Sequence, residues 1–304
     1  MSDLVQTARV SGVDRRDVEF ESGGVTLRGW LFVPPTGAAG RRLPAVVMAE
    51  GFAGVKEIGL ELFARPLAAE GIATLGFDYP CFGASDGGPR QRLDPKAQLR
   101  AYRDGLSYAA GRDEIDADRL GLWGASFAGG HVLSLCADRA PVRCAMAVVP
   151  FLGATVDDVA VQTLRGIRWG VPHLLRGRVP VVASDTHAFA MMPDPEAYAT
   201  LMAVAAERAP AYRNWITADS LPRIARYRPA AAARRIRTPV RLVSMSEDVV
   251  TPPQPVRRIA RALGDRADLQ ELTGTHFAIL GAQLERVQAL TVEWFSAQLG
   301  VSPR

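Results

Sequence analysis

Apolar and polar residues alternate in two runs near the start of the chain, at 17–21 and 25–33, and Ser22-Gly23-Gly24 joins them. Alternation with a period of two is typical of strands that bury one face. Because glycines at such a junction allow a tight reversal of the chain, the pattern predicts a β-hairpin.

Short apolar runs then alternate with stretches of helical periodicity. In the run 145–149 every residue is apolar, which is typical of a strand buried on both faces. Strands are predicted at 44–49, 72–78, 119–123, 142–149, 240–245 and 268–272. Apolar residues at helical spacing form two faces: Leu99, Tyr102, Leu106 and Ala109, and Leu284, Val287, Leu290 and Trp294. Strands that alternate with helices predict an α/β fold with a mostly parallel sheet.

The segment 151–237 interrupts this alternation. It contains helical patterns at 157–169 and 195–208, one short apolar run at 179–183, and several prolines. We predict that it is a helical cap inserted between two strands of the sheet. On this prediction, residues 1–150 and 238–304 form the core domain.

Composition and charge exclude several functional classes. The chain has 304 residues, 48% of them hydrophobic, and three cysteines without CxxC spacing, as expected of a cytoplasmic protein with reduced thiols. The sequence shows neither a secretory signal nor an apolar run long enough to span a membrane. Its net charge of +4 comes from scattered arginines, so no nucleic-acid partner is expected. Histidine spacing predicts no metal, and no nucleotide or flavin fingerprint predicts a cofactor.

The first chemical signal is the sequence Leu-Trp-Gly-Ala-Ser-Phe-Ala-Gly-Gly at 122–130. A buried strand ends at Trp123 and a helix rich in small residues follows Ser126, which is the context of a nucleophile elbow. The small residues Gly124 and Ala128 let the backbone segments approach closely. A tight strand-to-helix turn without catalytic function would explain the pattern equally well if the motif stood alone.

Two further residues follow in the order that a catalytic triad requires. Asp248 comes after a predicted strand, and His276 lies between the last strand and the final helix. Since the carboxyl ends of parallel strands share one edge of a sheet, Ser126, Asp248 and His276 are expected to meet there. Glu247 is the alternative acid, and we favour Asp248. The other histidines, His131, His173 and His187, are assigned to helix packing or to the cap.

An oxyanion hole and a substrate slot complete the predicted site. The backbone amides of Phe52, in a glycine-rich turn after a strand, and of Phe127 are the expected oxyanion donors. The adjacent Glu50 would oppose negative charge there unless Lys56 or an arginine neutralises it. The expected substrate contacts are cap residues with apolar surface: Trp169, His173, Met192, Met202 and Trp215. Each of them could instead only pack the cap onto the sheet.

Several segments resemble the α/β-hydrolase superfamily, and more narrowly a subgroup with dienelactone-hydrolase-like esterases and polyketide acyltransferases. The resemblance lies in residues 51–57, 78–87 and 89–91 and in the elbow with its trailing Gly-Gly-His. It implies an α/β-hydrolase fold over nearly the whole chain. Two positions depart from the pattern, because members often carry histidine where Glu50 stands and glycine where Cys81 stands.

These observations predict a serine hydrolase that cleaves an ester or thioester through an acyl-enzyme on Ser126, with a medium or large hydrophobic acyl group. The expected partner is a small-molecule acyl substrate, including a thioester of CoA or of a carrier protein. The alternatives are an acyltransferase of polyketide-type metabolism, a peptidase, a carbon–carbon bond hydrolase and a non-catalytic binding protein. The sequence leaves open whether the chain forms a homodimer.

Overall fold

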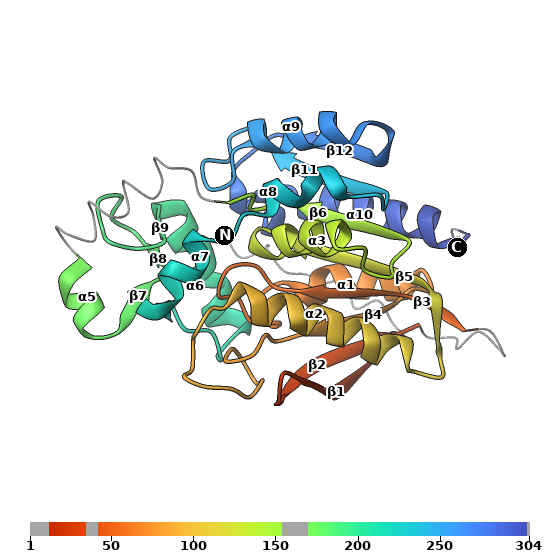
Figure 1. Ribbon diagram of the computed structural model, residues 1–304, viewed down its shortest axis with the longest axis horizontal. Helices are drawn as coiled ribbons and strands as arrows, with labels where there is room; N and C mark the ends of the chain where they lie inside the picture. The colour runs from red at the N-terminus through yellow and green to blue at the C-terminus, as the bar shows by residue number, and fades with distance from the viewer. Residues whose placement is uncertain (1–11, 35–41, 154–169, 303–304) are drawn as a thin grey trace.

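An eight-stranded sheet forms the centre of the structure, a computed structural model that describes residues 12–34, 42–153 and 170–302 (Figure 1). In chain order its strands are β1 (Asp14–Ser22), β2 (Val25–Val33), β3 (Leu43–Ala49), β4 (Ala73–Phe77), β5 (Ile115–Ala125), β6 (Cys144–Val148), β11 (Val240–Met245) and β12 (Ala267–Leu272). Their spatial order is β1-β2-β4-β3-β5-β6-β11-β12. From β4 to β12 all neighbours are parallel, whereas β2 pairs antiparallel with β1 and β4. The predicted α/β fold with a mostly parallel sheet is confirmed.

The N-terminal hairpin is also confirmed. Strands β1 and β2 pair from Asp14↔Val33 to Ser22↔Val25. The two turn residues, Gly23 and Gly24, have φ angles of 59° and 83°, a left-handed geometry that glycine adopts without steric cost.

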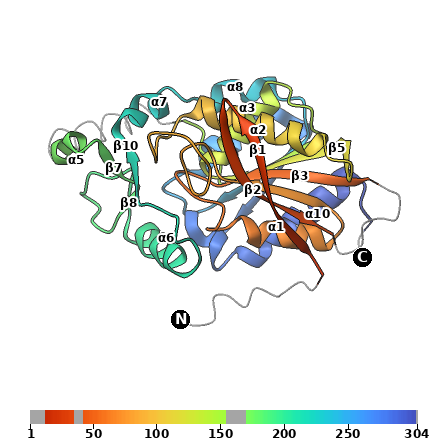
Figure 2. The same cartoon turned by 90° about the horizontal axis from the view of Figure 1, so that it is seen from below.

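Helices cover both faces of the sheet (Figure 2). The helices that flank it are α1 (Leu60–Ala69), α2 (Pro95–Ala110), α3 (Phe127–Ala137), α9 (Pro253–Leu263) and α10 (Leu284–Leu299). Helices α1 and α10 bury their apolar residues in one core cluster, and α2, α3 and α9 bury theirs in another. The predicted apolar faces therefore point inward, except that Leu99 and Leu284 are only partly buried.

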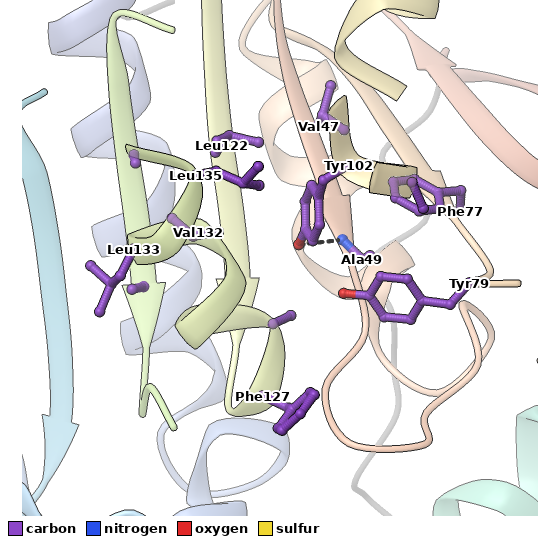
Figure 3. Close-up of a cluster of buried hydrophobic side chains, with 14 of the residues drawn as sticks. Val47, Ala49, Phe77, Tyr79, Tyr102, Leu122, Phe127, Val132, Leu133 and Leu135 are labelled. Atoms are coloured by element: carbon purple, nitrogen blue, oxygen red, sulfur yellow. Dashed lines mark hydrogen bonds between the residues drawn. The ribbon is translucent and has the colours of Figure 1, made fainter. Parts of the chain in front are cut away.

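One buried hydroxyl connects α2 to the two strands that lead into the site. The Tyr102 hydroxyl donates to the Trp123 carbonyl at 2.9 Å. It also accepts from the Ala49 amide at 3.0 Å (Figure 3). Because Ala49 and Trp123 lie near the carboxyl ends of β3 and β5, this contact fixes both strand ends relative to each other.

The segment between β6 and β11 is less purely helical than predicted. Its elements are α5 (Val171–Leu175), β7 (Arg178–Pro180), β8 (Val182–Ala183), β9 (Met192–Pro193), α6 (Pro195–Arg208), β10 (Trp215–Thr217), α7 (Leu221–Ala225) and α8 (Pro229–Ala232). Strand β10 pairs with β7, and β8 pairs with β9. Helix α6 matches the prediction at 195–208 and is capped by Asp194, whose side chain accepts from the Ala197 amide at 2.7 Å.

Strands of two or three residues are too short to show a period of two, which explains why the sequence did not indicate them. The helix predicted at 157–169 lies outside the described residues. The division into a core domain (1–150 and 238–304) and a cap (151–237) stays a prediction.

Among the described residues, no helix combines the length and apolar character needed to cross a membrane. The described residues also form short 3₁₀ helices: η2 (Ala218–Ser220), η3 (Ala233–Arg235), η4 (Gly264–Arg266) and η5 (His276–Leu280).

Candidate active site

Ser126 occupies a sharp turn between β5 and α3. Its φ of 56° and ψ of −118° are unusual for a residue with a side chain, and such strain persists only where the surroundings impose it. The surroundings are tight, because a Cβ at Gly124 would lie 2.6 Å from the Ala128 carbonyl. The small residues at 124 and 128 therefore allow the turn that presents Ser126 at the carboxyl edge of the sheet.

Three side chains from separate loops form a hydrogen-bonded chain at this edge. His276 Nε2 lies 3.0 Å from Ser126 Oγ, and His276 Nδ1 lies 2.7 Å from Asp248 Oδ2. Asp248 is 3% exposed and His276 5%, so water competes little for these contacts. The arrangement can remove a proton from the Ser126 hydroxyl and hold the resulting imidazolium against a carboxylate.

The Asp248 carboxylate is held by four donors. Its Oδ1 accepts from the amides of Val250 and Thr251 at 2.8 and 2.7 Å, and its Oδ2 accepts from the Thr251 hydroxyl at 2.8 Å besides His276. Glu247 is exposed and makes no contact with His276. The geometry thus places the favoured acid, Asp248, against His276. It also adds Thr251, which the sequence did not indicate as part of the site. An Asp-x-x-Thr spacing after a strand would have been the signal for this partner.

The side chains of the two residues whose amides are the expected oxyanion donors contact each other. The rings of Phe52 and Phe127 meet edge to face with centroids 5.3 Å apart. A Cβ at Gly51 would lie 3.2 Å from Ser126 Cβ, so the turn that carries Phe52 passes directly next to the serine. The Phe127 amide is the first of α3, and neither this amide nor that of Phe52 donates to another described residue. Both remain available to a bound oxyanion.

Ser126 and His276 open into a mainly apolar cavity of about 70 Å³. Apolar walls come from Phe63 of α1, from Phe277 and Leu280 just after the histidine, and from Met192 and Leu201 of the inserted segment. Sequence reasoning named Met192 but missed the others. Phe277 and Leu280 were signalled only by their position next to His276.

The other expected substrate contacts lie elsewhere or cannot be placed. His173 packs against Phe189, with ring centroids 6.1 Å apart, and Met202 is partly buried against the core. Trp215 lines a second hollow that does not include Ser126. Trp169 lies outside the described residues. Of the four that the structure describes, only Met192 shares the cavity with the serine.

Glu50 lines the same cavity as Ser126. Its carboxyl group accepts from the Gly59 amide at 2.8 Å and from the Gly51 amide at 3.3 Å. Burial raises the pKa of Glu50 to about 7, although these hydrogen bonds oppose the shift. Of the two kinds of neutralising partner considered, Lys56 does not serve, because its Nζ pairs with Asp78 at 2.7 Å, and no arginine of the described residues forms an ion pair with Glu50. Protonation is the remaining way to keep the group uncharged.

His131 has a structural environment. Its Nδ1 lies 2.7 Å from the Tyr227 hydroxyl and its Nε2 lies 3.0 Å from Gln98 Oε1, so both ring nitrogens are occupied. Burial lowers the pKa of His131 to about 3, which keeps the ring neutral. It packs beneath Phe127, with centroids 5.0 Å apart, and supports the start of α3. In the described part of the chain, no group of three or more metal-ligating side chains gathers in one place.

Comparison with known proteins agrees with this architecture. Residues 44–189 match the family described as the alpha/beta hydrolase fold. The chain is 33% identical to the quorum-quenching protein AidA of Acinetobacter baumannii, over 89% of this chain and 91% of that protein. It is 28% identical to the thiohydrolase aneE of Aspergillus aculeatus, over 91% of this chain and 92% of that protein. The crystal structure of GrgF from a Penicillium species, which is named a polyketide transferase, has a TM-score of 0.77 at 23% identity and covers 94% of this chain and 99% of its own.

The chain therefore belongs to the α/β-hydrolase family and is an enzyme of that class. Within the family it is similar to the subgroup of thiohydrolases and polyketide acyltransferases that the sequence indicated.

Proposed function

We propose that the protein is a serine hydrolase that cleaves an ester or thioester through an acyl-enzyme. The observation that carries the proposal is the continuous hydrogen-bonded chain from Asp248 through His276 to Ser126, which ends at an apolar cavity. A strained, partly accessible serine next to a buried histidine is the arrangement of an activated nucleophile.

In the acylation step, Ser126 Oγ attacks the carbonyl carbon while His276 Nε2 takes the hydroxyl proton. The amides of Phe52 and Phe127 hold the oxyanion that forms. When this intermediate collapses, the bond to the leaving alcohol or thiol breaks and His276 returns the proton to it. In the second half, His276 removes a proton from water, which attacks the acyl carbon and releases the carboxylic acid and the free serine.

A thioester, with a thiol as its leaving group, is the favoured substrate class. The support is that aneE, which is similar to this chain over nearly the whole length of both, is named a thiohydrolase. A medium or large hydrophobic acyl group is favoured because the cavity walls are aliphatic and aromatic. Met192 and Leu201 support the further proposal that segment 151–237 covers Ser126 as a cap. Acyl transfer to an alcohol is the second candidate, since GrgF is named a polyketide transferase. It differs only in the nucleophile of the second half-reaction.

Acyl-chain preference tests the proposed substrate class. With thioesters from acetyl to octanoyl, kcat/KM is expected to rise up to a few-fold per added carbon until the cavity is full, because each buried methylene contributes about 0.8 kcal/mol. Met192→Trp should move the optimum to shorter chains, because Met192 lines the cavity. Met202→Trp, at a partly buried methionine outside the cavity, is the matched control and should leave the optimum unchanged. A steady fall from acetyl to octanoyl would contradict a hydrophobic acyl substrate.

The pH profile tests the role assigned to Glu50. Because the pKa of Glu50 is raised to about 7, the group is neutral below that pH and anionic above it. An anion beside the oxyanion opposes its formation, so kcat/KM should fall by about tenfold as pH rises through this range. Glu50→Gln should remove this alkaline fall. Glu61→Gln, on the outer side of α1, should keep the wild-type profile, and an alkaline fall that survives in Glu50→Gln would assign it to another group.

A further inference from the structure

A second hollow, of about 510 Å³, lies where the loop after β4 meets the inserted segment. It is lined by Gly83, Arg90, Gln91, Arg178, Ala211, Arg213 and Trp215, and we call it the arginine pocket. It contains Trp215, which the sequence analysis expected to contact the acyl group. All three arginines are exposed, so their guanidinium groups are within reach of a ligand in solution.

The guanidinium groups are held in place without being neutralised. Arg90 donates to the carbonyls of Ser85 and Gly83, and Arg213 donates to those of Pro210 and Tyr212 at 2.7 and 2.8 Å. Arg178 lies over the Trp215 ring, 4.2 Å from its centroid. These contacts orient the arginines, but a carbonyl or a ring leaves the positive charge uncompensated.

No carboxylate of the described residues forms an ion pair with any of these three arginines. Two acids near them in sequence have other partners, since Asp86 pairs with Arg28 at 2.6 Å and Asp219 with Arg92 at 2.9 Å. Three oriented and unpaired cations around one hollow are an arrangement suited to a multiply charged anion, above all a phosphate.

Side-chain and main-chain hydrogen bonds connect the arginine pocket to the cavity at Ser126. Gln91 Nε2 donates to the carbonyls of Arg213 and Trp215 at 3.2 and 3.3 Å, which fixes the loop after β4 to β10. On the other side of β10, the Val181 amide donates to Asn214 and the Val181 carbonyl accepts from the Met192 amide at 2.8 Å. Since neighbouring strands lie about 4.8 Å apart, Trp215 and the cavity wall at Met192 are separated by roughly two strand spacings.

We propose that the arginine pocket binds the phosphate groups of a phosphorylated thioester donor, such as an acyl-CoA, whose acyl group enters the cavity at Ser126. The inference rests on the proposed function for its thioester chemistry. The three guanidinium groups recognise phosphate oxygens as paired donors, and the two adjacent sites bind the charged and the apolar ends of one substrate. The pocket thereby selects donors that carry phosphate over neutral thioesters with the same acyl group.

The test compares CoA binding and thioester turnover in matched double variants. Arg178→Gln/Arg213→Gln removes two charges from the pocket, and Arg235→Gln/Arg257→Gln removes two charges from exposed ion pairs at Asp138 and Glu271. CoA itself is titrated calorimetrically against each protein at low and high salt. In parallel, kcat/KM is measured for one acyl group carried on CoA, on phosphopantetheine and on pantetheine without phosphate.

We expect the pocket variant to bind CoA about tenfold more weakly and to lose most of the preference for acyl-CoA, through KM, while its rate on the phosphate-free thioester is unchanged. The control variant should behave as wild type, and added salt should weaken CoA binding in both. The phosphopantetheine thioester shows whether the phosphate of the arm is sufficient or the nucleotide phosphates are required. Equal CoA affinity in the two variants, or no CoA binding by the wild type, would overturn the pocket assignment. Failure of the proposed function is distinguishable, because then the phosphate-free thioester would be left uncleaved or would be cleaved equally well without Ser126.

Discussion

Ser126→Ala is expected to lower kcat/KM for thioester or ester cleavage by about 10⁴–10⁶-fold, which is the largest effect of any single change in this protein. The reason is that in the proposed mechanism the hydroxyl oxygen forms the covalent bond to the acyl group. The other hydroxyl near the His276 ring, that of Thr251, lies at Nδ1 and not at Nε2, so it cannot replace Ser126. The residual rate comes from the oxyanion amides and substrate binding, which the variant keeps. Its fold should persist, because alanine removes one oxygen atom at a site that packing already constrains.

Two measurements separate this result from a loss of structure. Circular dichroism and thermal unfolding should match the wild type, and a fluorophosphonate probe should label the wild type at Ser126 but leave the variant unlabelled. Ser246→Ala is the matched control, since Ser246 is an exposed serine at the carboxyl end of β11. If Ser126→Ala retained turnover near the wild-type rate, the nucleophile assignment would be wrong.

The sequence predicted the fold well where its signals are long. The alternation at residues 17–21 in β1 and apolar runs such as the one in β6 indicate which faces are buried, so they translate directly into strands. The two small sheets in the inserted segment have strands of two or three residues, and main-chain pairing rather than side-chain pattern defines them. The pattern of side chains in the described part of this segment therefore indicates the helix α6 but not the short strands β7, β8, β9 and β10.

Within the candidate site, the sequence indicated which residues could carry the chemistry. It did not indicate which way the side chains of the inserted segment point. The order of serine, acid and histidine could be anticipated because parallel strands end at one edge. Whether a cap side chain faces the serine depends on how short elements cross, and this explains why Met192 lines the cavity whereas Trp215 lines the arginine pocket. For the same reason the partner of Lys56 was misjudged: Asp78, at the end of β4, lies closer in space than Glu50, which is closer in sequence.

Asp248→Asn is expected to lower kcat by about 10³–10⁴-fold while KM changes little. Asparagine has nearly the same shape and can still accept from the amides of Val250 and Thr251, so the loop should keep its structure. The variant loses the negative charge that stabilises the His276 imidazolium. An asparagine amide that donates toward Nδ1 would also favour the tautomer whose Nε2 carries the proton and cannot accept one from Ser126.

The neighbouring acid provides the control for this second prediction. Glu247→Gln removes the same charge one residue away, but Glu247 is exposed and does not contact His276, so its kcat should stay within about two-fold of wild type. Steady-state kinetics on one thioester across pH 6–9 would compare the two variants directly. At every pH tested, the deficit of Asp248→Asn should exceed that of Glu247→Gln. If Glu247→Gln proved the more damaged protein, the acid of the triad would be Glu247, and the 2.7 Å contact between Asp248 and His276 would have to be structural rather than catalytic.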